Sequence, residues 1–380
     1  MLEFFDYPTL RLTWWLLLGI LLIGYAVMDG FDLGLAILYR WLTHTDQERR
    51  VFLETIEPVW EGNQIWLVLG GGAIFAAWPL LYATAFSGFY FALLLVLLGL
   101  IIRPVGLNFR NKVSHPRWRA MWDWGLFVSG LVPALVFGVA FGNLFLGVPY
   151  YFDDTLRVFY TGSFWALLNP FALLVGVVSI LMLCLHGATY AALKVDRTLA
   201  PRARRAGIVC GVLFIAAFIG AGAWLYWQPI PAYHLASMLP PDHPSNPLLK
   251  AVVVHSDWFH HYRTQPWLWW APGVAVGGAL LTALLLRLKR DGLAFITSSL
   301  VQAGTILTAG IALFPFFLPS STHPSHSLSV WDASSSPLTL GLMLVAVVIF
   351  LPLVLAYTAW VFRVMKGRVT LAHVKHSSDY

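Results

Sequence analysis

The sequence predicts an all-α polytopic membrane protein in which residues 1–380 form a single integral membrane domain. Hydrophobic residues make up 59% of the chain and charged residues only 11%, whereas about a quarter of a soluble domain is charged. Apolar stretches of about 20 residues, long enough to cross a bilayer as a helix, recur along the whole chain. Lys and Arg gather in alternate connections between these stretches, as expected for a chain that crosses a membrane repeatedly.

Hydropathy along the chain predicts about nine transmembrane helices. Their approximate bounds are 12–38, 53–78, 80–102, 122–146, 164–190, 206–227, 266–286, 292–317 and 338–362. Pro79 interrupts the apolar run between the second and third spans, so we expect these two to form a tight helical hairpin. The number of spans is compatible with two four-helix bundles plus one extra helix.

The positions of the basic residues predict the orientation. The connections after the first, third, fifth and seventh spans, together with the C-terminal tail, hold nearly all of the 24 Lys and Arg residues. The other side is left with Arg11, Arg157, Lys250 and Arg263. The positive-inside rule therefore places the N-terminus outside and the C-terminus in the cytoplasm. The basic loops are topology signals that contact anionic membrane lipid, and nucleic acid is not an expected partner.

Two outer loops have distinctive compositions. The loop at 228–265, on the periplasmic side, contains the histidines His234, His243, His255, His260 and His261. The adjacent pair leaves two interpretations open, a metal site or a solvated loop with mixed polar residues. The Ser-rich loop at 319–337 should be ordered because Trp331 and Asp332 can pack and form hydrogen bonds.

The stretch from Glu54 to Trp78 is long and apolar enough to cross a bilayer, yet it is polar in its first half. On one continuous helix, Glu57 and Glu61 would be one turn apart and would form part of a polar stripe. A carboxylate in hydrocarbon costs at least ~2.5 kcal/mol, so such a residue is expected to face a protein interior or a water-filled path. A solvated helix end explains Glu54 well, but Glu61 lies deeper.

A second polar group belongs to the first span. Asp29 and Asp32 are three residues apart and share a helix face. Arg103 ends the third span and Asp123 begins the fourth on the same, cytoplasmic side. These four residues suggest a buried ion-pair network, which either locks helices together or relays protons.

Histidine and cysteine are scarce within the predicted spans. His186 is the only histidine there, whereas a bis-histidine heme needs two axial ligands, so we expect His186 to make a helix contact or lie at the surface. Cys184 and Cys210 fall in apolar runs, and without a CxxC motif or Cys/His cluster we expect buried free thiols and no metal site. Trp60, beside Glu61, either packs in the core or walls a pocket for a flat apolar ligand such as a quinone.

Long motifs along nearly the whole chain carry a family resemblance. They include WWLLLGILLIGYAVMDGFDLG, EPVWEGNQIWLVLGGGAIFAAWP, YATAFSGFY, IIRPVGLNFR, RWRAMWDWG, GVAFGNLFLGVP, YTGSFWALLNPFALL, TAGIALFPFFLPSS and SLSVWDASSSPLTL. In these motifs the chain resembles subunit II of cytochrome bd ubiquinol oxidase. The resemblance is weakest in the 228–265 loop and the C-terminal tail.

The resemblance implies a heme-free subunit that pairs with a related nine-helix subunit I in the bacterial cytoplasmic (inner) membrane. Subunit I would carry hemes b and d and the quinol-oxidising loop, and small single-helix subunits are further candidate partners. The complex would oxidise quinol and reduce dioxygen to water with protons taken from the cytoplasm. No cofactor is expected on this chain other than a structural quinone.

The resemblance also implies roles for individual residues. Glu61 matches the acid of the W-(D/E)-G-N-Q motif that lines the cytoplasmic proton path, and Glu57 and Trp66 are assigned to the same path. Trp60 resembles the tryptophan near a structural quinone. Asp32, Arg103 and Asp123 match polar positions of the family's inner-side network, to which Asp29 is assigned as well. Asn108 stands where close relatives often have aspartate, and Glu61 replaces the commoner aspartate.

The sequence is therefore interpreted as a subunit that stabilises subunit I and passes protons through Glu61. An alternative is a proton-coupled secondary transporter with Asp29, Asp32 and Glu61 as coupling sites, which should show broken helices or an internal repeat. A further alternative is a structural scaffold whose carboxylates only hold helices together.

Overall fold

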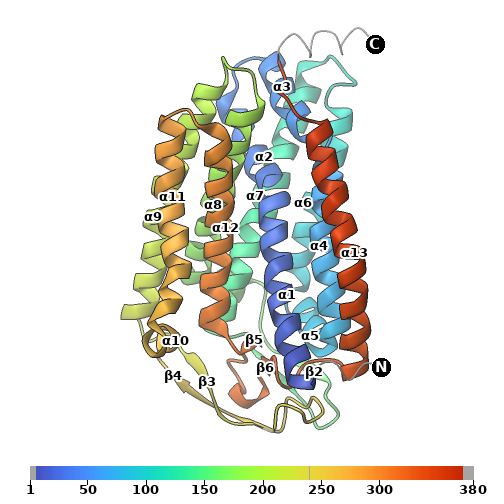
Figure 1. Cartoon of the computed structure of the whole chain (residues 1–380), viewed down its shortest axis with the longest axis vertical. Helices are drawn as coiled ribbons and strands as arrows, with labels where there is room; N and C mark the ends of the chain where they lie inside the picture. Colours follow the sequence, from blue (N-terminus) through green and yellow to red (C-terminus); the bar gives the residue numbers. More distant parts are fainter. Residues whose placement is uncertain (1–5, 239, 371–380) are drawn as a thin grey trace.

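The computed structural model describes residues 6–238 and 240–370 and shows an elongated bundle of helices (Figure 1). The helices are α1 (Tyr7–Met28), α2 (Gly30–Leu42), α3 (Asp46–Ile56), α4 (Trp60–Ala77), α5 (Pro79–Gly88), α6 (Tyr90–Phe109), α7 (Pro116–Leu146), α8 (Pro170–Lys194), α9 (Ala200–Trp227), α10 (His260–Thr264), α11 (Trp270–Arg287), α12 (Asp291–Leu313) and α13 (Pro337–Val364). The strands are β1 (Tyr150–Phe152), β2 (Val158–Tyr160), β3 (Ala232–Ser237), β4 (Ala251–His255), β5 (Phe316–Leu318) and β6 (Leu328–Ser329). The strands form three antiparallel pairs, β1–β2, β3–β4 and β5–β6.

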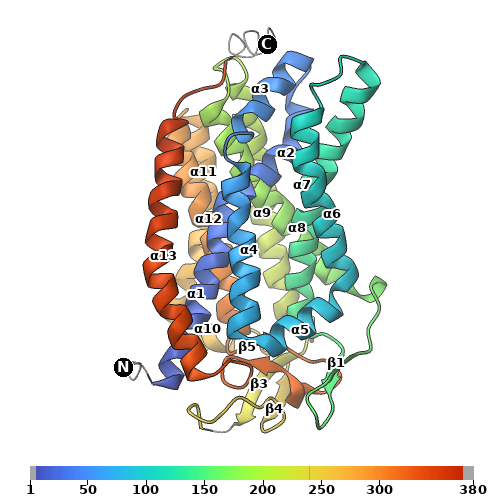
Figure 2. The ribbon, with the colours of Figure 1, turned by 90° about the vertical axis from the view of Figure 1, so that its right-hand side faces the viewer.

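The all-α polytopic class is confirmed. Among the described residues, 8 helical segments are long and apolar enough to cross a membrane, and α1 and α2 count together as one segment of 36 residues. The second predicted span is absent from this set because α4, with 18 residues, begins with the polar sequence WEGNQ. Since α4 packs along α1 and follows the long axis of the bundle (Figure 2), we count it as a further crossing, in agreement with the predicted number.

The second predicted span is wrong as a single helix. Helix α3 ends at Ile56, and Glu57, Pro58 and Val59 form a turn before α4 begins at Trp60. Pro58 has no backbone N–H with which to continue the hydrogen bonds of α3, which accounts for a break at this point, while Glu57 itself keeps helical dihedral angles. Helix α3 starts instead at a capping box, in which the Thr45 hydroxyl accepts a hydrogen bond from the Glu48 N–H at 3.2 Å.

The predicted tight hairpin between the second and third spans is also wrong. The ten-residue helix α5 separates α4 from α6 and lies at the lower end of the bundle in Figure 2. Helix α4 packs mainly on α1, whereas α6 packs mainly on α7. The two membrane crossings are therefore neighbours in sequence but rest on different helices.

The helices form one closed bundle and one open group. Helices α8, α9, α11 and α12 make a closed ring in which each packs on two others. The other group has α2 packed on α7, α6 packed on α7 and α4 packed on α1, so it is open between α4 and α6. Helix α13 lies against α1 and α4 as the extra helix.

Helix α2 is held between α7 and α8 by close backbone contacts. A Cβ atom on Gly34 would overlap the carbonyl oxygen of Leu183, and a Cβ atom on Gly187 would lie 2.5 Å from the backbone nitrogen of Leu35. On the other side, a Cβ atom on Gly130 would lie 2.6 Å from the carbonyl oxygen of Leu33. Small residues therefore let α2 approach both neighbours, as is common between membrane helices.

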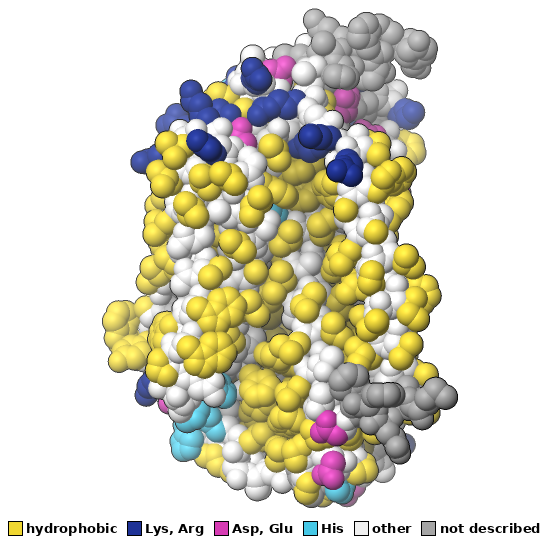
Figure 3. Space-filling model, in the orientation of Figure 1, with side chains coloured by type: hydrophobic (Ala, Val, Ile, Leu, Met, Phe, Trp, Pro, Cys, Tyr) yellow, Lys and Arg dark blue, Asp and Glu magenta, His cyan; other side chains and the backbone are white. Residues whose placement is uncertain are grey.

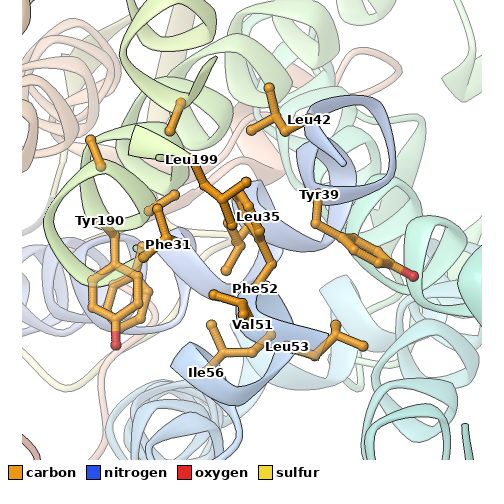
Figure 4. Close-up of a cluster of buried hydrophobic side chains, with 14 of the residues drawn as sticks. Phe31, Leu35, Tyr39, Leu42, Val51, Phe52, Leu53, Ile56, Tyr190 and Leu199 are labelled. Atoms are coloured by element: carbon orange, nitrogen blue, oxygen red, sulfur yellow. The ribbon is translucent and has the colours of Figure 1, made fainter. Parts of the chain in front are cut away.

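An apolar cluster surrounds the upper part of α2. Figure 4 shows Phe31 from α2 against Tyr190 from α8, and the two rings stack with centroids 4.0 Å apart. Phe52 and Ile56 of α3 pack into the same cluster and are fully buried. Helix α3 is thus anchored to the bundle by its apolar face.

The two ends of the bundle differ in charge. Lys and Arg side chains gather at the upper end in Figure 3, near α3, and we call this the inner end because the positive-inside rule assigns it to the cytoplasm. Helix α1 begins at the opposite, outer end and α13 ends at the inner end (Figure 1). At the outer end, the ammonium of Lys250 lies 2.9 Å from the Asp332 carboxylate. Asp332 also accepts a 2.6 Å hydrogen bond from Ser329, so the predicted order of the 319–337 loop is confirmed.

Candidate functional site

Asp29 and Asp32 lie at a joint in the first span. Asp29 ends α1 and precedes α2, but the hydrogen bond from its N–H to the Tyr25 carbonyl, at 2.9 Å, keeps the two helices nearly continuous. Asp32 lies in the first turn of α2. Both side chains are fully buried, because α2 is enclosed by α7 and α8.

Arg103 of α6 forms an ion pair with Asp29. Its Nη2 lies 2.7 Å from Oδ1 of Asp29, and both side chains are 0% exposed. Each ion has lost its hydration, so the pair itself adds little net stability, whereas loss of one partner would leave a buried charge without compensation. The predicted contact between Arg103 and a carboxylate of the first span is therefore present.

Asn63 of α4 completes the cluster from another side. Its amide donates a 2.8 Å hydrogen bond to Oδ2 of Asp32. Neither Asn63 nor Tyr25 is among the predicted site residues. Tyr25 lies one turn before Asp29 on the same helix face, and Asn63 is an amide in an apolar span, so both positions carried a signal.

Several polar atoms of this cluster have no hydrogen-bond partner within the described part of the chain. They are Oη of Tyr25, Oδ2 of Asp29, Oδ1 of Asp32, and Nε and Nη1 of Arg103. Buried polar atoms are almost always paired with protein or ordered water. The cluster therefore has spare donors and acceptors, which is the property that a proton-exchanging site needs.

Glu61 does not face the interior of this chain. It lies in the first turn of α4 with an exposed side chain, two residues from the buried Asn63. Glu57 is exposed in the turn that precedes α4, so the predicted alignment of Glu57 and Glu61 on one helix is wrong. Helix α4 thus presents an acid outward and an amide inward within one turn.

Asp123 belongs to a separate cluster nearer the inner end. Its carboxylate accepts hydrogen bonds from Tyr39 at 3.0 Å and Arg49 at 2.6 Å, and it pairs with Arg110 at 2.5 Å. Arg110 in turn reaches Asp46 of α3 at 2.8 Å. The predicted network of four residues is therefore two networks, of which this one joins α2, α3, α6 and α7.

The two predicted site tryptophans differ in their surroundings. Trp66 is buried, and its ring occupies the space that a Cβ atom on Gly24 would need, so α4 and α1 touch there. Trp60 is partly buried and packs against the apolar cluster of α2 and α3. A large cavity runs through the bundle, and Trp60 does not line it.

That cavity has a volume of about 890 Å³ and runs between α1, α7, α8, α9, α11 and α12. Tyr25, Gly30 and Leu33 line it next to the buried polar cluster, and Trp258 and Trp269 line it near the outer end. Its lining is almost entirely apolar. Its size and chemistry suit a long apolar ligand with one polar end.

The scarce histidine and cysteine residues have structural surroundings. Nδ1 of His186 lies 2.7 Å from the Ser298 hydroxyl and Nε2 lies 2.9 Å from the Val27 carbonyl. Both ring nitrogens are therefore occupied, which confirms His186 as a helix contact. Cys184 and Cys210 are buried and free, as predicted.

Comparison with known proteins accords with this architecture. The pattern of the family described as "Cytochrome bd terminal oxidase subunit II" matches residues 10–365. The chain is 48% identical to "Probable cytochrome oxidase subunit 2" of Haemophilus influenzae, over 98% of this chain and 99% of that protein. It is also 48% identical to "Cytochrome bd-I ubiquinol oxidase subunit 2" of Escherichia coli, over 98% of each.

The fold is similar to that of a solved bd oxidase chain from Geobacillus thermodenitrificans. The TM-score is 0.62 at 18% sequence identity, and the match covers 94% of this chain and 98% of that chain. At this identity the likeness concerns the fold alone. Because the family pattern covers most of the chain and the two relatives align with it nearly end to end, the chain belongs to the cytochrome bd terminal oxidase subunit II family.

Proposed function

We propose that this chain is the heme-free second subunit of a quinol-oxidising terminal oxidase that reduces dioxygen to water in the bacterial inner membrane. Its partner would be a heme-bearing subunit I with hemes b and d. The observation that carries the proposal is the 48% identity to the bd-I ubiquinol oxidase subunit 2 of E. coli over 98% of each chain. The heme-free assignment is supported by His186, the only histidine of the described spans, whose two ring nitrogens are both bound to protein.

The proton path, in this proposal, runs along the surface of α4 that faces subunit I. Glu61 is exposed in the first turn of a membrane-crossing helix, and an ionised carboxylate there is costly against lipid. A partner subunit or a water-filled path would remove that cost. Glu57, also exposed at the inner end, would take protons up before Glu61, and the buried Trp66 would support the helix that carries both the acid and the amide.

The buried cluster around Asp29 would serve the same path or hold its walls in place. Asn63 links the two, because it is two residues from Glu61 and donates its hydrogen bond to Asp32. The unpaired donors and acceptors of Asp32 and Arg103 support a role in proton exchange through ordered water. A role as a helix lock is supported by the direct Asp29–Arg103 ion pair.

Replacement of Glu61 tests the proton path. In the purified complex, Glu61→Ala should slow quinol-dependent oxygen consumption about tenfold or more, since a positioned proton-transfer group typically contributes at least that much. Glu61→Asp should retain most of the activity because it keeps the carboxylate. Asp154→Ala, at an exposed acid of the outer end, is the matched control. Normal turnover in Glu61→Ala, with full heme content as the check on assembly, would exclude the role.

A structural quinone is proposed as a second ligand. The sequence assigns it to Trp60, whereas the apolar cavity that ends beside Tyr25 offers the space for a polar headgroup with a long tail. Gly222 lines this cavity and has open space where a Cβ atom would be, so Gly222→Leu should displace a ligand from it. Gly220, which has open space as well but does not line the cavity, provides the control Gly220→Leu.

The quinone extracted from the purified complex distinguishes the two positions. Loss of quinone in Gly222→Leu, with retention in Gly220→Leu and Trp60→Ala, would place the ligand in the cavity. Loss in Trp60→Ala alone would place it at Trp60. Retention in all three variants would contradict both assignments.

A further inference from the structure

Three histidines group at the outer end, away from the polar cluster and the proposed proton path. Ala232 of β3 pairs with His255 of β4, so His234, two residues further along β3, is a diagonal neighbour of His255 on the same face of the hairpin. The ring centroids of His234 and His255 are 6.0 Å apart. His260, the first residue of α10, brings its ring centroid to 5.3 Å from that of His234. Histidine side chains are visible together near the lower end in Figure 3.

The carboxylate of Asp257 lies near the His260 ring. Oδ2 of Asp257 lies 3.9 Å from Nδ1 of His260, and Asp257 is itself fixed by a 2.7 Å ion pair with Arg263. At 3.9 Å the carboxylate forms no hydrogen bond with the ring, so His260 is free to turn. A small rotation would let Asp257 accept a hydrogen bond from Nδ1–H and leave Nε2 for a metal ion, as in the carboxylate–histidine pairs that support metal ligands.

The spacing of the rings suits coordination of one ion. Two imidazoles on a tetrahedral zinc, with nitrogens at about 2.0–2.1 Å from the metal, have ring centroids roughly 5 Å apart. In the described residues no three donor side chains already surround a common point. His255 and His260 are exposed, so rotation of these side chains toward the partly buried His234 meets little resistance.

We propose that His234, His255 and His260 bind a divalent transition-metal ion such as Zn²⁺ at the outer end of the protein. Imidazole nitrogen suits zinc, nickel and copper, whereas calcium and magnesium prefer oxygen ligands. Water would complete the coordination of the ion.

Such an ion would tie α10 to the β3–β4 hairpin. The outer part of the apolar cavity is lined by Trp258 and Phe259, which directly precede His260, and by Tyr262, two residues after it. The bound ion would therefore hold the wall of the cavity mouth in one position. This consequence does not depend on the proton path or on the identity of the cavity ligand.

Zinc binding to the detergent-solubilised complex, purified without a polyhistidine tag, tests the proposal. Isothermal titration calorimetry should show one saturable site for Zn²⁺ that His255→Gln and His260→Gln each weaken about tenfold or more, and Asp257→Asn should weaken it to a similar degree. His243→Gln, in the same loop but outside the group, should bind zinc as the parent does. Absence of a saturable site in the parent, or equal affinity in the His255→Gln and His260→Gln variants, would overturn the proposal.

Discussion

Replacement of Arg103 by glutamine tests whether the buried cluster is held by opposite charges. At 2.7 Å and an effective dielectric constant near 20, the attraction between Arg103 and Asp29 is about 6 kcal/mol. Desolvation costs several kcal/mol for each ion, so the intact pair contributes little net free energy. Arg103→Gln removes the attraction but leaves Asp29 buried, and breaking a buried pair in this way costs about 3–5 kcal/mol.

The double variant Arg103→Gln/Asp29→Asn removes both charges at once. It should be more stable than Arg103→Gln by about 2 kcal/mol, because Asp29 is then no longer a buried charge that has lost its ion-pair partner, while Asp32 is the same in both variants. Arg287→Gln, at an exposed position at the end of α11, should change the free energy of unfolding by less than about 0.5 kcal/mol.

Unfolding of the purified complex in mixed micelles, followed by circular dichroism, gives the free energies for this cycle. Heme content per complex, measured beforehand, shows whether each variant assembles. If Arg103→Gln were as stable as the parent, or if the effects of Arg103→Gln and of Asp29→Asn, each measured alone, simply added in the double variant, the charge-pair reasoning would be refuted.

Two further predictions concern the packing of α2 and the outer hairpin. Gly34→Ala should destabilise the protein by about 1–3 kcal/mol through overpacking against Leu183, whereas Gly19→Ala, which meets open space, should be neutral, and the same unfolding assay compares them. Equal stability of the two variants would contradict the close approach of α2 and α8. Burial lowers the pKa of His234, and the neighbouring His260, His255 and His261 lower it further, whereas Asp257 opposes the shift. Just below pH 6.5 the folded state therefore binds fewer protons than the unfolded state. The β3–β4 hairpin should therefore lose stability as the pH falls through that window. Amide hydrogen exchange over Ala232–Ser237, corrected for its intrinsic rate, should become faster as the pH falls. In His234→Gln the corrected exchange rate should not change with pH.

The membrane spans were largely predictable because each is a long apolar run between polar connections. The breaks within them were not predicted, although some left signals. Pro58 marks the end of α3, and the Thr45–Glu48 capping box marks its start. The break at Phe89 between α5 and α6 follows Ser87 and Gly88, a weaker signal within an apolar stretch.

The polar site was predictable in its members but not in its connections. Composition and depth identified Asp29, Asp32 and Arg103, because charged residues in hydrocarbon need partners. The separation of Asp123 from them depends on where α3 places Asp46 and Arg49, which is a matter of tertiary packing. The outward direction of Glu61 likewise follows from the turn at Pro58, which sets the rotation of α4 independently of α3.

The close crossing of α2 with α8 has a consequence for how the sequence can vary. Main-chain atoms rather than side chains set the distance between these two helices at Gly34 and Gly187. The depth of Asp29 and Asp32 is therefore independent of which apolar residues cover the lipid-facing sides of the other helices. Drift or redesign of those outer faces leaves the two carboxylates where they are, whereas a single methyl group at either glycine displaces them.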